Sequence, residues 1–227
     1  MLEWLKRHAW KACNRQKRFG SSNLPHSALF LKHANAHPRA SVFFYLKDME
    51  QGYIHIYTGN GKGKTTAAFG LAIRALCAGK NVAIGQFVKS MKYNETKAEA
   101  LFNGANPDFG RLHIEQLGYG CCLDRMPDER DRQSAKDGLA VCRQWLRSGE
   151  WDVVILDELT IATSMKLLSV DEVLDLLSER NPATEVVITG RYAPQQLIDA
   201  ADLVTDMQEV KHYYAQDEAQ MLKSALY

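Results

Sequence analysis

Thr58-Gly59-Asn60-Gly61-Lys62-Gly63-Lys64-Thr65-Thr66 is the stretch of this sequence that decides the fold. It follows the β-rich apolar run 53–57 and precedes the alanine-rich run 67–76, which has a helical pattern. A strand, a glycine-rich loop ending in Gly-Lys-Thr and a helix together form a P-loop. In a P-loop, backbone N–H groups and the positive end of the helix dipole surround phosphates. We therefore predict a nucleotide site here.

The side chains of this loop have separate expected roles. Lys64 reaches the phosphate oxygens, and the Thr65 hydroxyl is a ligand for Mg²⁺. Thr58 replaces the glycine that usually stands five positions before the Gly-Lys pair, so the register of the phosphates can differ from the usual one. The loop residues predicted to bind the nucleotide are Gly59, Asn60, Gly61, Lys62, Gly63, Lys64, Thr65 and Thr66.

Strand-like and helix-like runs alternate through the rest of the chain. The strand-like runs are 53–57, 82–88, 111–117, 151–156, 184–189 and 203–207. The helix-like runs are 65–78, 94–102, 127–148, 169–180 and 194–201. Strands rich in Val, Ile and Leu that alternate with helices predict a P-loop-containing three-layer α/β/α fold. Its twisted sheet has five to six mostly parallel strands with helices on both faces.

Polar residues follow the predicted strands, and ligands of such sheets bind beyond the carboxyl ends of the strands. Asp157 and Glu158 follow a strand and are expected to complete the Mg²⁺ shell with Thr65; the alternative is a solvated pair at a strand end. Lys89 adds positive charge near the phosphates or is a surface lysine. Arg191 clamps phosphate or substrate, or forms a structural ion pair.

Charge divides the chain near residue 48. Residues 1–48 hold nine Lys or Arg and two Asp or Glu. Residues 49–227 hold 19 Lys or Arg and 25 Asp or Glu. The basic segment is an organelle transit peptide, a membrane-surface helix, a poorly ordered extension, or upstream sequence in a protein whose translation starts at Met49. We expect residues 1–48 to lie outside the native domain and residues 49–227 to form it.

Composition narrows the class of protein. The mildly acidic body argues against a nucleic-acid-binding domain, which usually has a basic face. No apolar run approaches the roughly 18 residues that a membrane span needs. The five cysteines lack metal-site spacing, so we interpret them as reduced thiols of a cytoplasmic protein.

These motifs together resemble the ATP:corrinoid adenosyltransferases of the CobA/CobO/BtuR type. The resemblance covers about residues 52–212 in order and spacing, and the P-loop of that family looks like the present one. The matching segments are 57–68, Gln86-Phe87-Val88-Lys89, 153–160, Val187-Ile188-Thr189-Gly190-Arg191, 201–205 and Val210-Lys211-His212.

The resemblance implies transfer of the 5′-deoxyadenosyl group from ATP to the Co(I) of a corrinoid, either cobalamin or cobyrinic acid a,c-diamide, with release of triphosphate. Lys64, Thr65 and Glu158 are then the catalytic candidates. It further implies Mg²⁺ or Mn²⁺, an electron donor of the flavodoxin or flavin-reductase type, and a homodimer.

The corrinoid pocket is where this sequence departs from the family pattern. Members carry an aromatic pair in a Gly-Phe-x-Trp segment, which Gly118-Tyr119-Gly120-Cys121 matches with one aromatic residue. The resemblance places Tyr119, Cys121, Lys211 and His212 at this pocket. The C-terminal Ser224-Ala225-Leu226-Tyr227 also differs from the family's usual ending.

Two other functions fit the same P-loop. A small-molecule kinase or ATPase would use arginines of a lid, for which Arg125, Arg130 and Arg132 are candidates. A nucleotide- or corrinoid-binding protein without turnover would retain the loop and lose the chemistry. A GTPase is disfavoured, because the sequence contains no Asn-Lys-x-Asp guanine motif.

Overall fold

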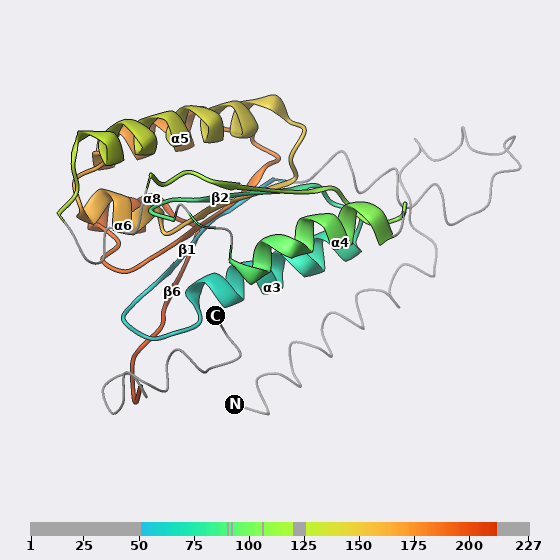
Figure 1. Ribbon diagram of the computed structural model, residues 1–227, viewed down its shortest axis with the longest axis horizontal. Coiled ribbons are helices and arrows are strands. Elements are labelled where there is room, and N and C mark those ends of the chain that lie inside the picture. Colours follow the sequence, from blue (N-terminus) through green and yellow to red (C-terminus); the bar gives the residue numbers. More distant parts are fainter. Residues whose placement is uncertain (1–50, 90, 92, 106, 120–125, 213–227) are drawn as a thin grey trace, which may run out of the picture. The chain divides into compact units, whose positions relative to one another are not determined.

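The computed structural model describes residues 51–89, 91, 93–105, 107–119 and 126–212 (Figure 1). The chain divides into two units, Met1–Met49 and Glu50–Tyr227, and all described residues belong to the second. The predictions for the basic segment, for Cys121 and for the C-terminal residues 224–227 therefore lie outside the described residues.

Six strands form one sheet in the order β3-β2-β4-β5-β1-β6. Every neighbouring pair is parallel, so the predicted fold class is confirmed. The central strands β2 and β4 are buried along their whole length, which explains their continuous Val, Ile and Leu content. The strands are β1 Ile54–Thr58, β2 Val82–Gln86, β3 Leu112–Gln116, β4 Val153–Asp157, β5 Glu185–Thr189 and β6 Leu203–Asp206.

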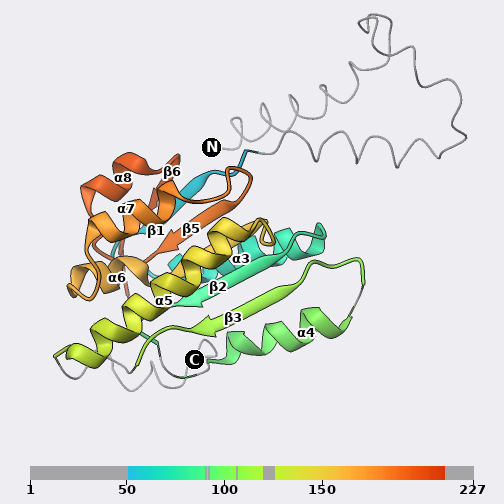
Figure 2. The same cartoon turned by 90° about the horizontal axis from the view of Figure 1, so that it is seen from above.

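Helices cover both faces of the sheet, and each face has its own apolar core (Figures 1 and 2). On one face lie α3, Lys64–Cys77, and α4, Ala98–Ala105, which follows the 3-10 helix η3, Asn94–Lys97. The helices on the other face are α5 Glu129–Ser148, α6 Leu159–Ser164, α7 Val170–Ser178 and α8 Gln195–Ala200. The described residues thus form the three predicted layers.

Local sequence signals explain where the longer helices begin and end. Asp128 and Asp131 form a capping box at the start of α5, and Gly149, with φ of 70°, ends it. Ser169 and Glu172 form the predicted capping box of α7. The predicted apolar face of α5 is buried as expected, at Ala135, Leu139, Cys142 and Leu146.

Most boundaries shift by one or more residues from the sequence prediction, and three differences lie close to the carboxyl ends of β2 and β4. Strand β2 ends at Gln86, two residues early, because the chain turns through Val88 with φ of 59°. Asp157 is the last residue of β4 and does not follow it. Helix α6 was not predicted, because it begins directly after the left-handed Glu158 and has no side-chain cap at its start.

The strand-centred core gives a direct prediction for stability. Ile155, in the middle of β4, is fully buried, so Ile155→Ala should lower the free energy of unfolding by about 2–5 kcal/mol. Ile73 on α3 is 48% exposed, and Ile73→Ala is the matched control, with an expected change of about 0.5 kcal/mol or less. Urea denaturation of both variants measures the difference; equal losses would contradict this description of the core.

Candidate nucleotide site

The carboxyl ends of β1, β2, β4 and β5 lie at the same edge of the sheet, and the chain turns sharply just beyond each. The turns contain Gly59 (φ 97°), Val88 (φ 59°), Glu158 (φ 60°) and Gly190 (φ 134°). For Val88 and Glu158 this left-handed conformation is strained, and such strain concentrates at functional sites. The turns bring Lys89, Glu158 and the glycine-rich loop to one place.

The glycine-rich loop packs with its back against the end of β6. A Cβ on Gly59 would lie 2.2 Å from Asp206 Oδ1, and one on Gly61 would lie 2.6 Å from the carbonyl oxygen of Met207. The Gly61 N–H donates a hydrogen bond of 2.6 Å to the same carbonyl oxygen. Packing against the end of β6 therefore requires glycine at these two positions.

Lys64 begins α3 and turns back over its own loop. Its ammonium donates hydrogen bonds to the carbonyl oxygens of Gly59, at 2.8 Å, and Gly61, at 2.6 Å. Burial lowers the pKa of Lys64, and the negative charge of Glu158 opposes that effect. Other predicted loop residues, Asn60, Lys62 and Thr66, are exposed. Lys64 is the loop cation that the fold holds in place.

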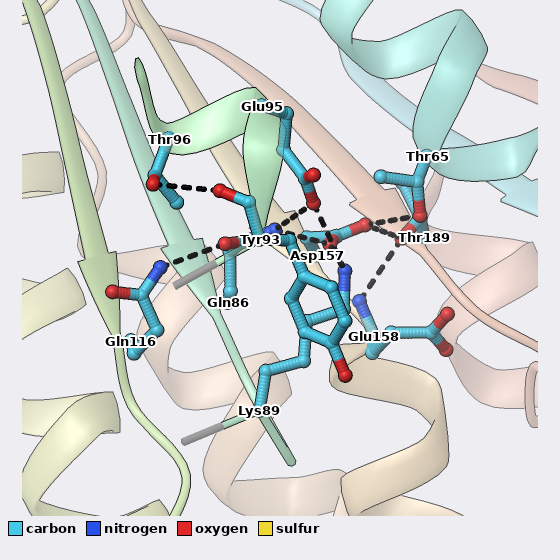
Figure 3. A network of polar contacts seen from close by, with 10 residues as sticks. All are labelled: Thr65, Gln86, Lys89, Tyr93, Glu95, Thr96, Gln116, Asp157, Glu158 and Thr189. Carbon is cyan, nitrogen blue, oxygen red and sulfur yellow. Dashed lines mark hydrogen bonds and ion pairs between the residues drawn. The ribbon is translucent and has the colours of Figure 1, made fainter. Parts of the chain in front are cut away.

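Asp157 is fully buried, and both of its carboxylate oxygens are occupied (Figure 3). Oδ1 accepts from the hydroxyls of Thr65, at 2.8 Å, and Thr189, at 2.7 Å. Oδ2 accepts from the Lys89 ammonium, at 2.8 Å, and from Gln86 Nε2, at 3.1 Å. Burial alone would raise the pKa of Asp157, but Lys89 and the hydroxyl donors hold that pKa below its usual value. Asp157 is therefore a buried carboxylate that stays ionised.

Lys89 is the cationic partner in this arrangement. Its side chain is 19% exposed, and its ammonium also lies 3.9 Å from Glu95 Oε1 and 5.4 Å from the centre of the Tyr93 ring. Although burial opposes the charged form, Asp157 raises the pKa of Lys89. Lys89 is thus an ion-paired residue of the site and not a surface lysine.

Glu158 is the neighbour of Asp157 in the chain, but its pKa shifts in the opposite direction. Burial, followed by the charge of Asp157, raises the pKa of Glu158, and Lys89, Lys64 and Arg191 partly counteract this. Arg191 is exposed, and its charge acts on both Lys64 and Glu158. When phosphates neutralise the three neighbouring cations, the Glu158 carboxylate is suited to bind a metal or a ribose hydroxyl.

Oxygen atoms at the end of the glycine-rich loop are of the kind that binds a divalent metal together with phosphates. Thr65 and Asp157 are in hydrogen-bond contact at the end of the P-loop, with Glu158 next in the chain. A hydroxyl and a carboxylate are ligands that Mg²⁺ prefers when substrate phosphates supply the others. Within the described residues, no group of three or more His, Cys, Asp or Glu could hold a metal by itself.

Of the residues predicted for the corrinoid pocket, the structure describes Tyr119, Lys211 and His212. Tyr119 is 53% exposed, and its hydroxyl accepts a hydrogen bond of 3.2 Å from Arg130. Lys211 is exposed and His212 is half-buried, both after β6. Of the arginines considered for a lid, Arg132 pairs with Glu129, and Arg125, like Cys121, lies outside the described residues.

Two of the four donors to Asp157 had received no role from the sequence. Gln86 and Thr189 are fully buried at the last positions of β2 and β5, on either side of β4. Gln116, on β3, donates to Gln86 Oε1 at 2.8 Å and extends the network to the sheet edge. The sequence signal that could have identified Gln86 and Thr189 is a polar residue at the carboxyl end of an apolar strand.

Comparison with known proteins identifies relatives. The family model described as ATP:corrinoid adenosyltransferase BtuR/CobO/CobP matches residues 50–223. A corrinoid adenosyltransferase of Pseudomonas aeruginosa is 37% identical over 165 residues, which is 73% of this chain and 79% of that protein. Another, from Escherichia coli K12, is 34% identical over 73% of this chain and 81% of its own length.

A third relative and one solved structure complete the comparison. The corrinoid adenosyltransferase CobA of Salmonella typhimurium is 35% identical over 73% of this chain and 81% of that protein. The RadB recombinase structure gives a TM-score of 0.46 at 14% identity, covering 72% of this chain and 77% of its own, and carries no functional argument. The family match spans both the glycine-rich loop and Asp157, and it confirms the resemblance inferred from the motifs. The chain belongs to the ATP:corrinoid adenosyltransferase family.

Proposed function

We propose that this chain transfers the 5′-deoxyadenosyl group of ATP to the Co(I) of a corrinoid and releases triphosphate. The observation that carries the proposal is the contact between Thr65, at the end of the glycine-rich loop, and the buried carboxylate of Asp157, at 2.8 Å. It unites a phosphate-binding loop and an acidic strand end within a chain of this family.

The chemistry requires a good leaving group more than an activated nucleophile. Electrons of Co(I) form the bond to ribose C5′, and the C5′–O bond breaks with its electron pair going to the triphosphate. Backbone N–H groups of the loop and the Lys64 ammonium stabilise this growing negative charge. To reach the phosphates, Lys64 exchanges its hydrogen bonds to the Gly59 and Gly61 carbonyls for bonds to phosphate oxygens.

Glu158 serves binding in this mechanism. Since no water or hydroxyl has to lose a proton, the reaction needs no general base. Mg²⁺ or Mn²⁺, held by Thr65 and Glu158 while Asp157 orients the Thr65 hydroxyl, would supply further positive charge to the leaving triphosphate. Lys89 and Arg191 complete the positive surroundings of the phosphates.

The remaining features of the proposed enzyme rest on the family resemblance. We place Tyr119, Cys121, Lys211 and His212 at the corrinoid pocket, an electron donor of the flavodoxin or flavin-reductase type beside it, and two chains in the active unit. No helix among the described residues is long and apolar enough to cross a membrane. We propose a cytoplasmic enzyme.

The product of ATP separates the candidate functions. The protein is incubated with ATP, Mg²⁺ and chemically reduced cobalamin, and the phosphate products and corrinoid spectrum are recorded. Triphosphate together with a light-sensitive Co–C bond is the expected result. ADP or free phosphate would support the kinase or ATPase function, and binding without either product would support a protein that has lost turnover.

Lys64→Ala should abolish measurable transfer, with a loss of at least about 10²–10³-fold, because one main donor to the leaving triphosphate is removed. The rate of triphosphate release measures the effect. Lys136→Ala, an exposed lysine on α5, is the matched control and should keep the wild-type rate. Full activity in Lys64→Ala would refute the role assigned to the loop.

Glu158→Gln should raise the stability of the protein at neutral pH, in the absence of nucleotide and metal, while lowering transfer. The pKa of Glu158 is raised in the folded state, so wild-type stability falls as pH rises from the unfolded pKa, near 4.5, through the folded one. Unfolding at a series of pH values should show the variant's advantage growing across that window and shrinking below it. An advantage that does not depend on pH would contradict the assignment.

A chain that begins at Met49 should transfer the adenosyl group at the rate of the full chain, within experimental error, because the family match begins at residue 50. Parallel assays of the two proteins check this. A large loss in the shorter chain would give residues 1–48 a part in the site.

A further inference from the structure

Thr189 is a buried residue of the network that has no assigned role. It ends β5, the strand that lies between the P-loop strand β1 and the acidic strand β4, and it is fully buried. Its hydroxyl donates to Asp157 Oδ1 at 2.7 Å and accepts from the backbone N–H of Glu158 at 3.0 Å. One hydroxyl group therefore contacts both acidic residues of the candidate site (Figure 3).

The hydrogen bond to Glu158 acts on a strained part of the backbone. Glu158 has φ of 60°, a left-handed conformation that residues with a Cβ rarely adopt. Such a conformation persists only where surrounding contacts determine it. The Thr189 hydroxyl supplies one such contact at the nitrogen atom of the strained residue.

The residue that follows Thr189 is Gly190, which packs closely against Thr160 and the Glu158 side chain. A Cβ on Gly190 would lie 2.2 Å from Thr160 Oγ1 and 3.4 Å from Glu158 Oε2. Thr160 donates in turn to the carbonyl oxygen of Arg191 at 2.7 Å. The end of β5 and the start of α6 thus fit closely, and the Glu158 carboxylate lies against Gly190.

Asp157 carries the effect of Thr189 on to the P-loop. Thr65 donates its hydroxyl hydrogen to the same oxygen atom, Asp157 Oδ1, that accepts from Thr189. With its hydrogen directed at Asp157, the Thr65 oxygen is left with lone pairs for a metal. The orientation of that carboxylate therefore decides the orientation of the Thr65 hydroxyl.

We propose that Thr189 is a positioning residue for adenosyl transfer, whose hydroxyl fixes Asp157 and Glu158 so that the Thr65 hydroxyl and the Glu158 carboxylate face the metal and phosphates of ATP. This inference rests on the proposed function. Thr189 acts through the two acidic residues and does not touch the nucleotide itself.

The chain contains a matched control for a purely structural threonine. Thr184 stands immediately before β5, at the opposite end of the strand, and is 1% exposed. Its hydroxyl donates to the carbonyl oxygen of Trp151 at 2.9 Å. Thr184→Val and Thr189→Val each remove one buried hydroxyl of the same strand region, but only the second hydroxyl contacts the acidic pair.

The kinetic test compares Thr189→Val, Thr189→Ser and Thr184→Val in the full chain. Both valine variants should lower the melting temperature. Thr189→Val should reduce kcat by about 10–10²-fold, since small misplacements of reacting groups cost rates of this order. Thr184→Val should keep the wild-type kcat, and Thr189→Ser should restore it. Equal kcat values in the two valine variants, or a serine variant as slow as valine, would overturn the proposal.

A binding measurement decides the matter independently of turnover. Calorimetry measures the affinity for ATP with and without Mg²⁺, using Thr189→Ala should the valine variant not fold. The affinity gained from Mg²⁺ should be lost in Thr189→Val or Thr189→Ala and kept in Thr189→Ser and Thr184→Val. An unchanged gain would refute the positioning role. Absence of transfer in the wild-type protein would instead refute the proposed function.

Discussion

The buried carboxylate of Asp157 is the interaction on which the candidate site depends. Its four donors come from four separate segments of the chain: the start of α3, the end of β2, the turn after β2 and the end of β5. An ionised group without access to water is costly unless it is fully paired. The requirement to satisfy this one carboxylate therefore holds the four segments in a fixed relation to each other.

The strained turns beyond β2 and β4 allow the contacts of Asp157 to form. The left-handed conformation of Val88 directs Lys89 back to Asp157. Glu158, the residue after Asp157, is also left-handed. Each conformation costs free energy by itself. The contacts with Asp157 and Thr189 offset that cost, so the acidic centre both requires the turns and stabilises them. Electrostatics and backbone geometry support each other here.

Much of this arrangement could be predicted from the sequence, because its signals are local. The Gly-Lys-Thr loop, the strands rich in Val and Ile and the capping box at Ser169 each lie within a few neighbouring residues. The parallel sheet and the position of Asp157 at its edge follow from them. Family motifs located the same site, and the family match confirmed the resemblance.

What could not be predicted depends on contacts between distant residues. Nothing local to Gln86 or Thr189 reveals that β2 and β5 lie on either side of β4, and only that order brings both side chains to Asp157. Helix α6 begins at the left-handed Glu158 without a side-chain cap, and the turn at Val88 contradicts the preference of a β-branched residue. The placement of Tyr119, Lys211 and His212 at a corrinoid pocket stays a prediction.

The position of β1 between β5 and β6 has a consequence for the order in which the protein forms. The glycine-rich loop is made early in synthesis, yet its strand pairs only with residues from 186 onward, and its back rests on Met207. Such long-range pairing is slow, and it waits for almost the whole domain to leave the ribosome. The glycine-rich loop is therefore synthesised long before the strand pairing that gives it its binding conformation. ATP can stabilise only the completely folded domain.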